Sequence, residues 1–413
     1  MMKRLYYAGI SVLVLCPFLF AQQQQARTGL DNILKYQSIF KGKRLGLITN
    51  HTAYNREGKH LIDVMAELPD VQITALFGPE HGIRGKEDAG RAIDSGEDST
   101  LQIPVYSLYG KTRKPTAEML QKVDVLVFDI QDIGARFYTY IWTMALAMEA
   151  AAEHGKEFVI LDRPNPINGL AVEGNILDTT FSSFVGLFPI PVRHGMTVGE
   201  LARLFKEEGW LNTERTLKLT VIPMSGWQRS MWFDETGLPF IKPSPNMPDL
   251  QTATVYPGIC LLEGTNVSEG RGTLTPFMHF GAPWIDADSL AVWLNALSLP
   301  GIRFKPTVFT PRSISGMSTY PKYENEICNG VKIVLTDRDK LQPYWTGIRI
   351  IETIYQHYPQ LLKWRKKHFD RLCGTKAIRN AILQRKDLQA LRRRWSVQLD
   401  RFKQTREACL LYR

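Results

Sequence analysis

Between residues 44 and 221 the chain alternates short apolar runs with segments of helical pattern. The apolar runs are Arg44–Thr49, Ile73–Phe77, Val123–Ile130 and Phe158–Leu161. Near-continuous apolar runs of this length suit strands that are buried on both faces of a parallel sheet. Helical patterns separate or follow them at Leu61–Leu68, Thr116–Lys122, Tyr138–His154 and Thr197–Glu208. The alternation predicts an α/β fold, a Rossmann-like doubly wound parallel sheet.

The pattern changes at a proline-rich stretch, Pro239–Pro248, which suits neither a regular helix nor a central strand. At roughly 100–200 residues per domain, 413 residues suggest two domains. We therefore expect a Rossmann-like catalytic domain over residues 27–250. A smaller α+β domain over residues 251–413, ending in two basic helices, would complete the cleft.

The N-terminus carries an export pattern. Two positive charges within Met1–Arg4 precede the apolar run Leu5–Phe20, and the small residue Ala21 precedes four glutamines. This order predicts a signal peptide over residues 1–26, and hence an exported protein, periplasmic or extracellular. The run is shorter than the roughly 20 residues of a membrane span, so we expect no stable span after cleavage. Four cysteines would remain, and their spacing decides no disulfide pairing.

The net charge of +10 comes from the end of the chain. Residues 361–413 contain 16 Lys and Arg but 4 Asp and Glu, so the remainder has a slight excess of acid. A solvated helical face explains this most simply. Nucleic acid is not expected as a partner of an exported protein, whereas anionic cell wall or membrane surface remains an alternative.

Polar side chains follow each of the four predicted strands. In open α/β sheets, ligands bind outside the carboxyl ends of the strands, so these residues are predicted to meet in one cleft. They are Asn50 and His51, Glu80 and His81, Asp129 and Asp132, and Asp162 and Arg163. Neither GxGxxG nor GxxxxGK[ST] occurs in the sequence, so a nucleotide cofactor is not expected.

Further candidates lie in loops rich in Gly and Pro, which hold backbone in defined turns. The first-domain candidates are Arg136, Tyr138, Asn165, Glu173, Arg193 and His194, and those of the second-domain loop are Glu263, Asn266, Glu269 and Arg271. Structural roles compete with these assignments. Asp132 could cap the helix near Tyr138, and Arg163 could pair with Asp162 or Glu173. Thr197 and Glu200 have capping-box spacing, which predicts a structural role.

A metal site has little support from spacing. His51, His81, His194, Asp129 and Asp132 could ligate a metal in principle, but neither HExxH nor HxH occurs. The GxSxG motif of the nucleophile elbow is absent from the sequence, so a serine hydrolase has no support. We therefore expect neither a metal nor another cofactor.

The motifs together resemble the exo-β-N-acetylmuramidases, once known only as a domain of unknown function. The resemblance covers residues 28–413 in order, through GLITNHT (46–52), FGPEHGIRG (77–85), FDIQDIGARFYTY (128–140), LDRPNP (161–166), VEGN (172–175), PIPVRHGMTVGELA (189–202), PSPNMP (243–248) and YPGICLLEGTNVSEGRGT (256–273).

The resemblance implies a cofactor-free glycoside hydrolase that releases terminal β-linked N-acetylmuramic acid from the non-reducing end of peptidoglycan fragments. It implies an active site between the two domains, with Glu80 of the GPEHG motif as the catalytic acid. It also brings Asn246 of PSPNMP into the site. The alternatives are a non-catalytic muropeptide-binding protein and a metal-dependent hydrolase.

Glycoside hydrolysis usually needs a second carboxylate. Asp129 from the same sheet is the leading candidate, and Glu263 or Glu269 would serve from across the cleft. The lactyl carboxylate of muramic acid calls for an arginine, which binds carboxylates bidentately. The candidates are Arg136, Arg163, Arg193 and Arg271, with Arg163 and Arg271 leading.

Overall fold

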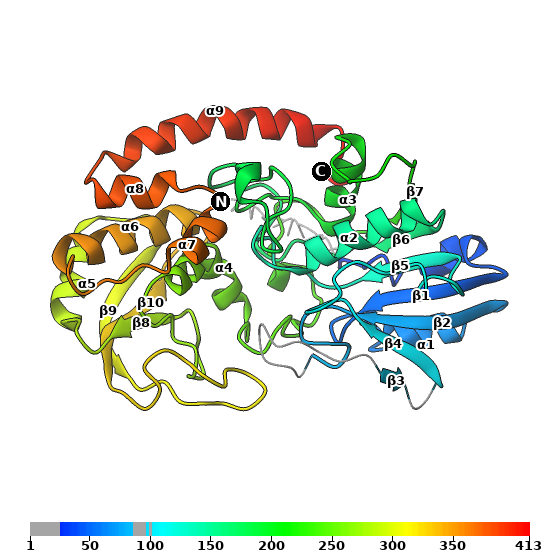
Figure 1. The fold of residues 1–413 in the computed structure, drawn as a ribbon, viewed down its shortest axis with the longest axis horizontal. Coiled ribbons are helices and arrows are strands. Elements are labelled where there is room, and N and C mark those ends of the chain that lie inside the picture. Colours follow the sequence, from blue (N-terminus) through cyan, green and yellow to red (C-terminus); the bar gives the residue numbers. More distant parts are fainter. Residues whose placement is uncertain (1–24, 86–95, 99–100) are drawn as a thin grey trace, which may run out of the picture.

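The computed structural model describes residues 25–85, 96–98 and 101–413. The predicted signal peptide, apart from its last two residues, lies outside this range. Figure 1 shows two lobes side by side, each built around its own sheet, with the last helix lying across both.

Seven strands of the described chain form the larger sheet, in the order β3-β4-β2-β1-β5-β6-β7. Every neighbouring pair is parallel except β3 with β4. The strands are β1 (Lys43–Thr49), β2 (Val71–Gly78), β3 (Gly96–Asp98), β4 (Ile103–Ser107), β5 (Val125–Asp129), β6 (Glu157–Leu161) and β7 (Lys218–Ile222).

Helices cover both faces of this sheet. One face packs against η1 (Ile33–Ile39) and α1 (Leu61–Ala66), and the other against α2 (Tyr140–Glu153) and α3 (Val198–Glu207). Strand β5 is buried along its whole length, which explains its unbroken apolar sequence. The doubly wound α/β fold predicted from the sequence is confirmed.

The second lobe is built on an antiparallel sheet, β8-β10-β9. Its strands are β8 (His279–Ala282), β9 (Ile302–Phe309) and β10 (Cys328–Leu335). Its helices are α4 (Leu250–Ile259), α5 (Ala287–Ala296), α6 (Pro343–His357), α7 (Lys366–Cys373), α8 (Ala377–Leu383) and α9 (Leu388–Glu407). One hydrophobic core runs from α2 through α4 into this sheet, so the two lobes share their interior.

Some local predictions were wrong. Thr116–Lys122 forms hydrogen-bonded turns and no helix, because seven residues are too few for their own backbone hydrogen bonds to stabilise one. The apolar pattern before Arg193 and His194 predicts a strand that ends there, but the structure has none, since Arg193 forms only isolated bridges. Strand β4 was not predicted because Pro104 interrupts its pattern. Three helices, not two, close the chain.

Two other local predictions were confirmed, those for the proline-rich stretch and for the capping box. Pro239–Pro248 contains neither helix nor strand. The hydroxyl of Thr197 accepts from the amide of Glu200, and the carboxylate of Glu200 accepts from the amide of Thr197. These two bonds form the capping box of α3. The four cysteines that the structure describes are buried thiols. Within that same part of the chain, no helix has the length and apolar character to cross a bilayer.

Candidate active site

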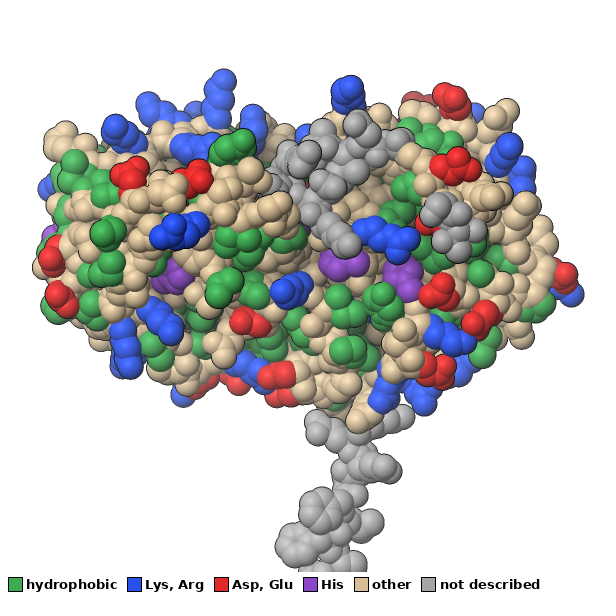
Figure 2. Space-filling view, turned by 90° about the horizontal axis from the view of Figure 1, so that it is seen from below, with side chains coloured by type: hydrophobic (Ala, Val, Ile, Leu, Met, Phe, Trp, Pro, Cys, Tyr) green, Lys and Arg blue, Asp and Glu red, His purple; other side chains and the backbone are tan. Residues whose placement is uncertain are grey.

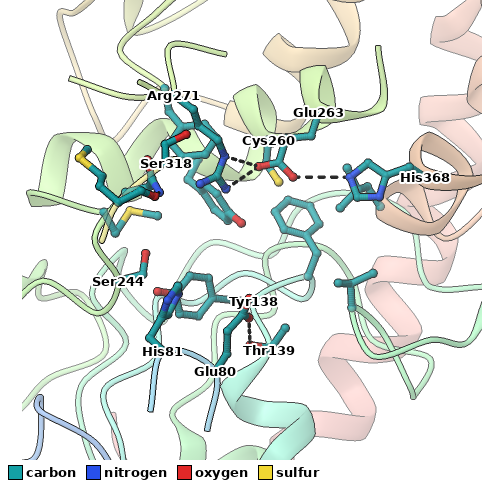
Figure 3. A pocket seen from close by; sticks show the side chains of 18 of the residues that line it. Glu80, His81, Tyr138, Thr139, Ser244, Cys260, Glu263, Arg271, Ser318 and His368 are labelled. Carbon is teal, nitrogen blue, oxygen red and sulfur yellow. Dashed lines mark hydrogen bonds and ion pairs between the residues drawn. The ribbon is translucent and has the colours of Figure 1, made fainter. Parts of the chain in front are cut away.

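A cavity of about 850 Å³ lies between the two lobes. One wall comes from the ends of β2 and β4 and from the start of α2, and the other from η4 (Cys260–Gly264), the loop after it and α7. Figure 3 shows Glu80 and Thr139 on one wall, opposite Glu263, Arg271 and His368 on the other. This size is within the range of small-molecule sites, typically about 300–1,000 Å³.

Glu80 is held by a tight loop directly after β2. The amide of Gly82 donates to the carbonyl of Pro79 at 2.9 Å, which closes a turn around Glu80. His81 has a φ of 70°, in the left-handed region that residues other than glycine rarely adopt. Such conformations persist where the surrounding fold enforces them, and they concentrate at functional sites.

Two hydroxyl groups contact the Glu80 carboxyl. Thr139 Oγ1 donates to Glu80 Oε2 at 2.7 Å. Tyr109, two residues beyond the end of β4, also hydrogen-bonds to Glu80. Burial and the neighbouring Glu80 carboxyl raise the pKa of Tyr109, so its hydroxyl stays protonated. Glu80 is thereby oriented from two sides while it still lines the cavity.

The opposite wall carries a compact charge cluster. Arg271 Nη2 lies 2.8 Å from Glu263 Oε1, and His368 Nε2 lies 3.5 Å from Glu263 Oε2. Burial alone would raise the pKa of the Glu263 carboxyl, but Arg271 and His368 outweigh it and hold that pKa well below its usual range. Glu263 is therefore a carboxylate at neutral pH.

Glu269 belongs to the same cluster, behind the wall. Its carboxylate lies 2.9 Å from Lys322 Nζ and 3.5 Å from Arg271 Nε, and the residue is 4% exposed. Glu269 does not line the cavity. Arg271 thus has a carboxylate on two sides, so its charge is already balanced.

The structure brings six of the predicted residues to the cavity: Glu80, His81, Tyr138, Asn246, Glu263 and Arg271. Asn246 Nδ2 donates to the carbonyl of Met317 at 2.5 Å, which ties the proline-rich segment to the opposite lobe. Tyr138 is buried against Tyr140 and Tyr256, with ring planes nearly perpendicular. The contact of Tyr138 with Tyr256 of α4 also joins the two lobes at the cavity.

The predicted pair at the end of β5 and β6 lies outside the cavity. Arg163 holds both oxygens of the Asp129 carboxylate, through Nε and through Nη2, the latter at 3.0 Å. Asp129 is fully buried and Arg163 is 5% exposed. The two side chains form a buried bidentate ion pair. Asp129 is therefore not available as a second carboxylate, and Arg163 is not available to bind a lactyl group.

Arg136 is also outside the cavity and is fully buried. Its Nη1 donates to the carbonyls of Asn175 and Ile190, each at 2.9 Å, and its Nη2 to those of Leu372 and Cys373 at 3.2 and 2.9 Å. These acceptors belong to both lobes. Arg136 therefore joins the lobes rather than binding a ligand.

Three more predicted residues are buried in connecting segments of the first lobe: Asp132 after β5, Asn165 after β6 and His194 before α3. Asp132 accepts from the amide of Gly134 at 2.7 Å, and burial raises its pKa to about 7. Asn165 Nδ2 donates to the carbonyl of Met196 at 3.0 Å. His194 is 1% exposed, and burial together with Arg406 lowers its pKa to about 3. Asp132 supports a turn and does not cap α2.

The residues after β1 also hold backbone in place. Asn50 Oδ1 accepts from the amide and hydroxyl of Thr52 at 3.0 and 2.6 Å. His51 Nε2 lies 2.7 Å from the carbonyl of Lys242. The imidazole of His51 packs so closely on Gly85 that a side chain there would overlap it, so His51 supports the Glu80 loop from behind.

The last three predicted residues lie elsewhere. Glu173 Oε1 accepts from the amide of Trp345 at 2.8 Å, at the start of α6. Glu173 and Arg193 line a second cavity, of about 340 Å³, bounded by α6 and α9. Asn266 Nδ2 donates to the carbonyl of Leu361 at 3.0 Å, and its Oδ1 accepts from the amide of Lys363 at 2.7 Å, so it joins two loops.

Several cavity residues were not predicted: Tyr109, Thr139, Ser244, Arg365 and His368. Tyr109 was not selected because it follows β4, a strand that the sequence pattern did not predict. Ser244 lies in the PSPNMP motif, where only Asn246 was selected. Arg365 and His368 stand in the basic C-terminal segment, where local charge gives no sign that one turn faces a cavity.

The described residues contain no group of three or more His, Cys, Asp or Glu side chains that could hold a metal ion. His194 Nε2 lies 3.9 Å from Asp132 Oδ2, but no third residue of His51, His81 and Asp129 joins this pair in such a group. In Figure 2, charges of both signs are scattered over the lower face of the molecule, and histidine side chains lie near its middle.

Comparisons with known proteins agree in their assignment. The curated peptidoglycan beta-N-acetylmuramidase NamZ of Bacillus subtilis (strain 168) is 48% identical over 394 residues, covering 95% of this chain and 92% of that protein. A solved DUF1343 family protein from Bacteroides fragilis NCTC 9343 has a TM-score of 0.86 at 39% identity, covering 94% of this chain and 100% of that one. A second from the same strain has a TM-score of 0.76 at 34% identity, covering 94% of this chain and 99% of its own.

Family models account for nearly the whole chain. The N-terminal model of the exo-beta-N-acetylmuramidase NamZ matches residues 45–251, and the C-terminal model matches residues 254–412. With the two halves matched in order, and with the cavity formed between them, this chain belongs to the exo-beta-N-acetylmuramidase NamZ family.

Proposed function

We propose that this protein is an exo-acting glycosidase that releases terminal β-linked N-acetylmuramic acid from the non-reducing end of peptidoglycan fragments. The observation that carries the proposal is the placement of carboxyl groups on facing walls of one cavity, Glu80 and Glu263. Hydrolysis of a glycosidic bond needs an acid at the leaving oxygen and usually a second carboxylate across the sugar.

In this proposal Glu80 is the general acid. Its carboxyl is oriented by Thr139 and Tyr109, and a proton donor must be positioned to within a fraction of an ångström. The stiff turn after β2 removes most of its backbone freedom. When Glu80 gives its proton to the glycosidic oxygen, the leaving sugar departs as an alcohol and positive charge develops on the ring.

Glu263 is the proposed second carboxylate. It is ionised, because Arg271 and His368 hold its pKa low, and an ionised carboxylate is what the second role requires. Of the three candidates from the sequence, it alone lines the cavity. Its bonds to Arg271 fix its position, and they favour a role in stabilising ring charge or orienting water.

A pair of chromogenic substrates tests the function directly. The purified protein should hydrolyse an aryl β-N-acetylmuramide much faster than the aryl β-N-acetylglucosaminide, which lacks the lactyl group. It should also release N-acetylmuramic acid from a muramic acid–glucosamine disaccharide. A chelator should leave these rates unchanged. Binding without hydrolysis would support the muropeptide-binding alternative, and loss of activity with chelator would support a metal-dependent hydrolase.

We further propose that the protein acts outside the cytoplasm, where peptidoglycan lies. The support is the order of charge, apolar run and small residue over residues 1–26. Cell fractionation followed by N-terminal sequencing checks this proposal. The mature chain should be found in the exported fraction and should begin near Arg27, whereas an intact Met1 on cytoplasmic protein would contradict export.

A further inference from the structure

The cavity offers few positive groups to an anionic substrate. Among its described lining residues the arginines are Arg271 and Arg365, and no lysine lines it. Arg271 already lies between two carboxylates, those of Glu263 and Glu269. Using Arg271 for a third carboxylate would leave one of the first two underpaired in a buried position, which is costly.

Arg365 differs from Arg271 in its exposure to solvent and in its lack of an ion pair within the described chain. It stands directly before α7, its side chain is exposed, and it forms no ion pair with any residue that the structure describes. Its charge is therefore not balanced by any carboxylate of the residues that the structure describes. The cluster of Glu263, Glu269, Arg271 and Lys322 sums to zero, so Arg365 gives its wall of the cavity a net positive charge.

The backbone of Arg365 is fixed although its side chain is exposed. The amide of Arg365 donates to the carbonyl of Gly264 at 2.8 Å, and its own carbonyl accepts from the amides of His368 and Phe369, each at 2.9 Å. Gly264 ends η4, the element that carries Glu263. These bonds fix the backbone of Arg365 relative to Glu263, and the exposed side chain reaches from there into the cavity.

The proposed substrate has one charge that a glucosamine lacks. Muramic acid carries its lactyl carboxylate on the sugar ring itself, so this group enters the cavity with the ring. There it would meet the ionised carboxylate of Glu263, and like charges at short range are repulsive. A carboxylate needs an uncommitted cation nearby to be bound rather than rejected.

We propose that Arg365 binds the lactyl carboxylate and thereby selects muramic acid over glucosamine. A guanidinium matches a carboxylate with two parallel N–H···O bonds, which gives both affinity and orientation. The role assigned is substrate selection, and the acid and the second carboxylate remain Glu80 and Glu263. This inference rests on the proposed function, because it assumes the muramic acid substrate.

The test compares Arg365→Met with Lys366→Met, which removes the positive charge of the next residue, also exposed. Initial rates are measured on the aryl muramide and the aryl glucosaminide. Arg365→Met should lower kcat/KM on the muramide roughly 10- to 100-fold, mainly through KM, and leave the low glucosaminide rate unchanged. Arg365→Lys should restore part of the loss, and Lys366→Met should behave as the wild type.

The possible outcomes distinguish a failure of the Arg365 assignment from a failure of the proposed function. If the wild type hydrolyses neither glycoside, the proposed function fails. If the wild type prefers the muramide and Arg365→Met keeps the same ratio between the two substrates, the function stands and the assignment of Arg365 is wrong. An equal loss on both substrates would also overturn it, because that pattern indicates a role that does not depend on the lactyl group.

Discussion

Glu80→Gln should abolish hydrolysis of the natural disaccharide while leaving its binding intact. Glutamine keeps the shape and can still accept from Thr139, but it has no proton to give to the leaving oxygen. General acid catalysis contributes about 10²- to 10⁴-fold, and we expect a loss in the upper part of that range. An aryl glycoside should lose less, since its phenolate departs without protonation. Initial rates on both substrates measure the difference.

Two further variants serve as a control for this prediction and as a test of the second carboxylate. Glu118→Gln makes the same chemical change at an exposed position that does not line the cavity, and should have wild-type rates. Glu263→Gln should reduce kcat on both substrates on the order of 100-fold, because both form the same charged ring. Near-normal turnover of the disaccharide by Glu80→Gln would remove Glu80 as the acid and would leave the glutamate of the opposite wall as the next candidate.

Arg163→Met should destabilise the protein strongly and should not change its choice of substrate. Arg163 holds both oxygens of Asp129, which is fully buried, so the substitution leaves a buried carboxylate without its partner. Breaking one side of a buried ion pair typically costs about 3–5 kcal/mol. Thermal unfolding measures the effect, with Arg401→Met on the exposed face of α9 as the matched control.

The effect of Arg163→Met should depend on pH in a defined direction. Burial raises the pKa of Asp129, and Arg163 is the main group that opposes this rise. Without Arg163 the folded-state pKa rises further above the unfolded value, so stability is lost as pH rises through it. The difference between variant and wild type should therefore shrink as pH is lowered from neutral.

A double variant shows how much of the lost stability comes from the unpaired charge and how much from the lost side-chain volume. Asp129→Leu combined with Arg163→Met removes both charges, and such replacements of buried pairs are often neutral or stabilising. The double variant should recover much of the stability lost by Arg163→Met. A stable Arg163→Met protein with an altered ratio of muramide to glucosaminide hydrolysis would contradict the structural role and return Arg163 to the substrate.

The two candidates after β2 and β5 show how far a sequence pattern reaches. Glu80 and Asp129 both follow apolar strands, and both were expected at the same edge of the sheet. Asp129 is covered, because β5 lies in the middle of the sheet and the chain after β6 returns Arg163 over it. Glu80 follows β2, and its loop reaches the gap between the lobes.

The sequence by itself determined the features that depend on neighbouring residues. The buried strands β1, β2, β5 and β6, the capping box of α3 and the tight turn around Glu80 follow from local pattern and local hydrogen bonds. The sequence motifs also identified the family. These features need only a few residues to specify them.

Only the tertiary structure decided which polar side chains face the cavity and which hold the fold together. Arg136 reaches a carbonyl 236 residues away, and the wall opposite Glu80 is completed by Arg365 and His368 from a segment that looks like a solvated basic helix. A charged side chain that follows a strand has the same local sequence whether its partner is a ligand or a distant residue of the chain. Its role is set by long-range packing, which decides whether a carbonyl, a countercharge or open space lies next to it.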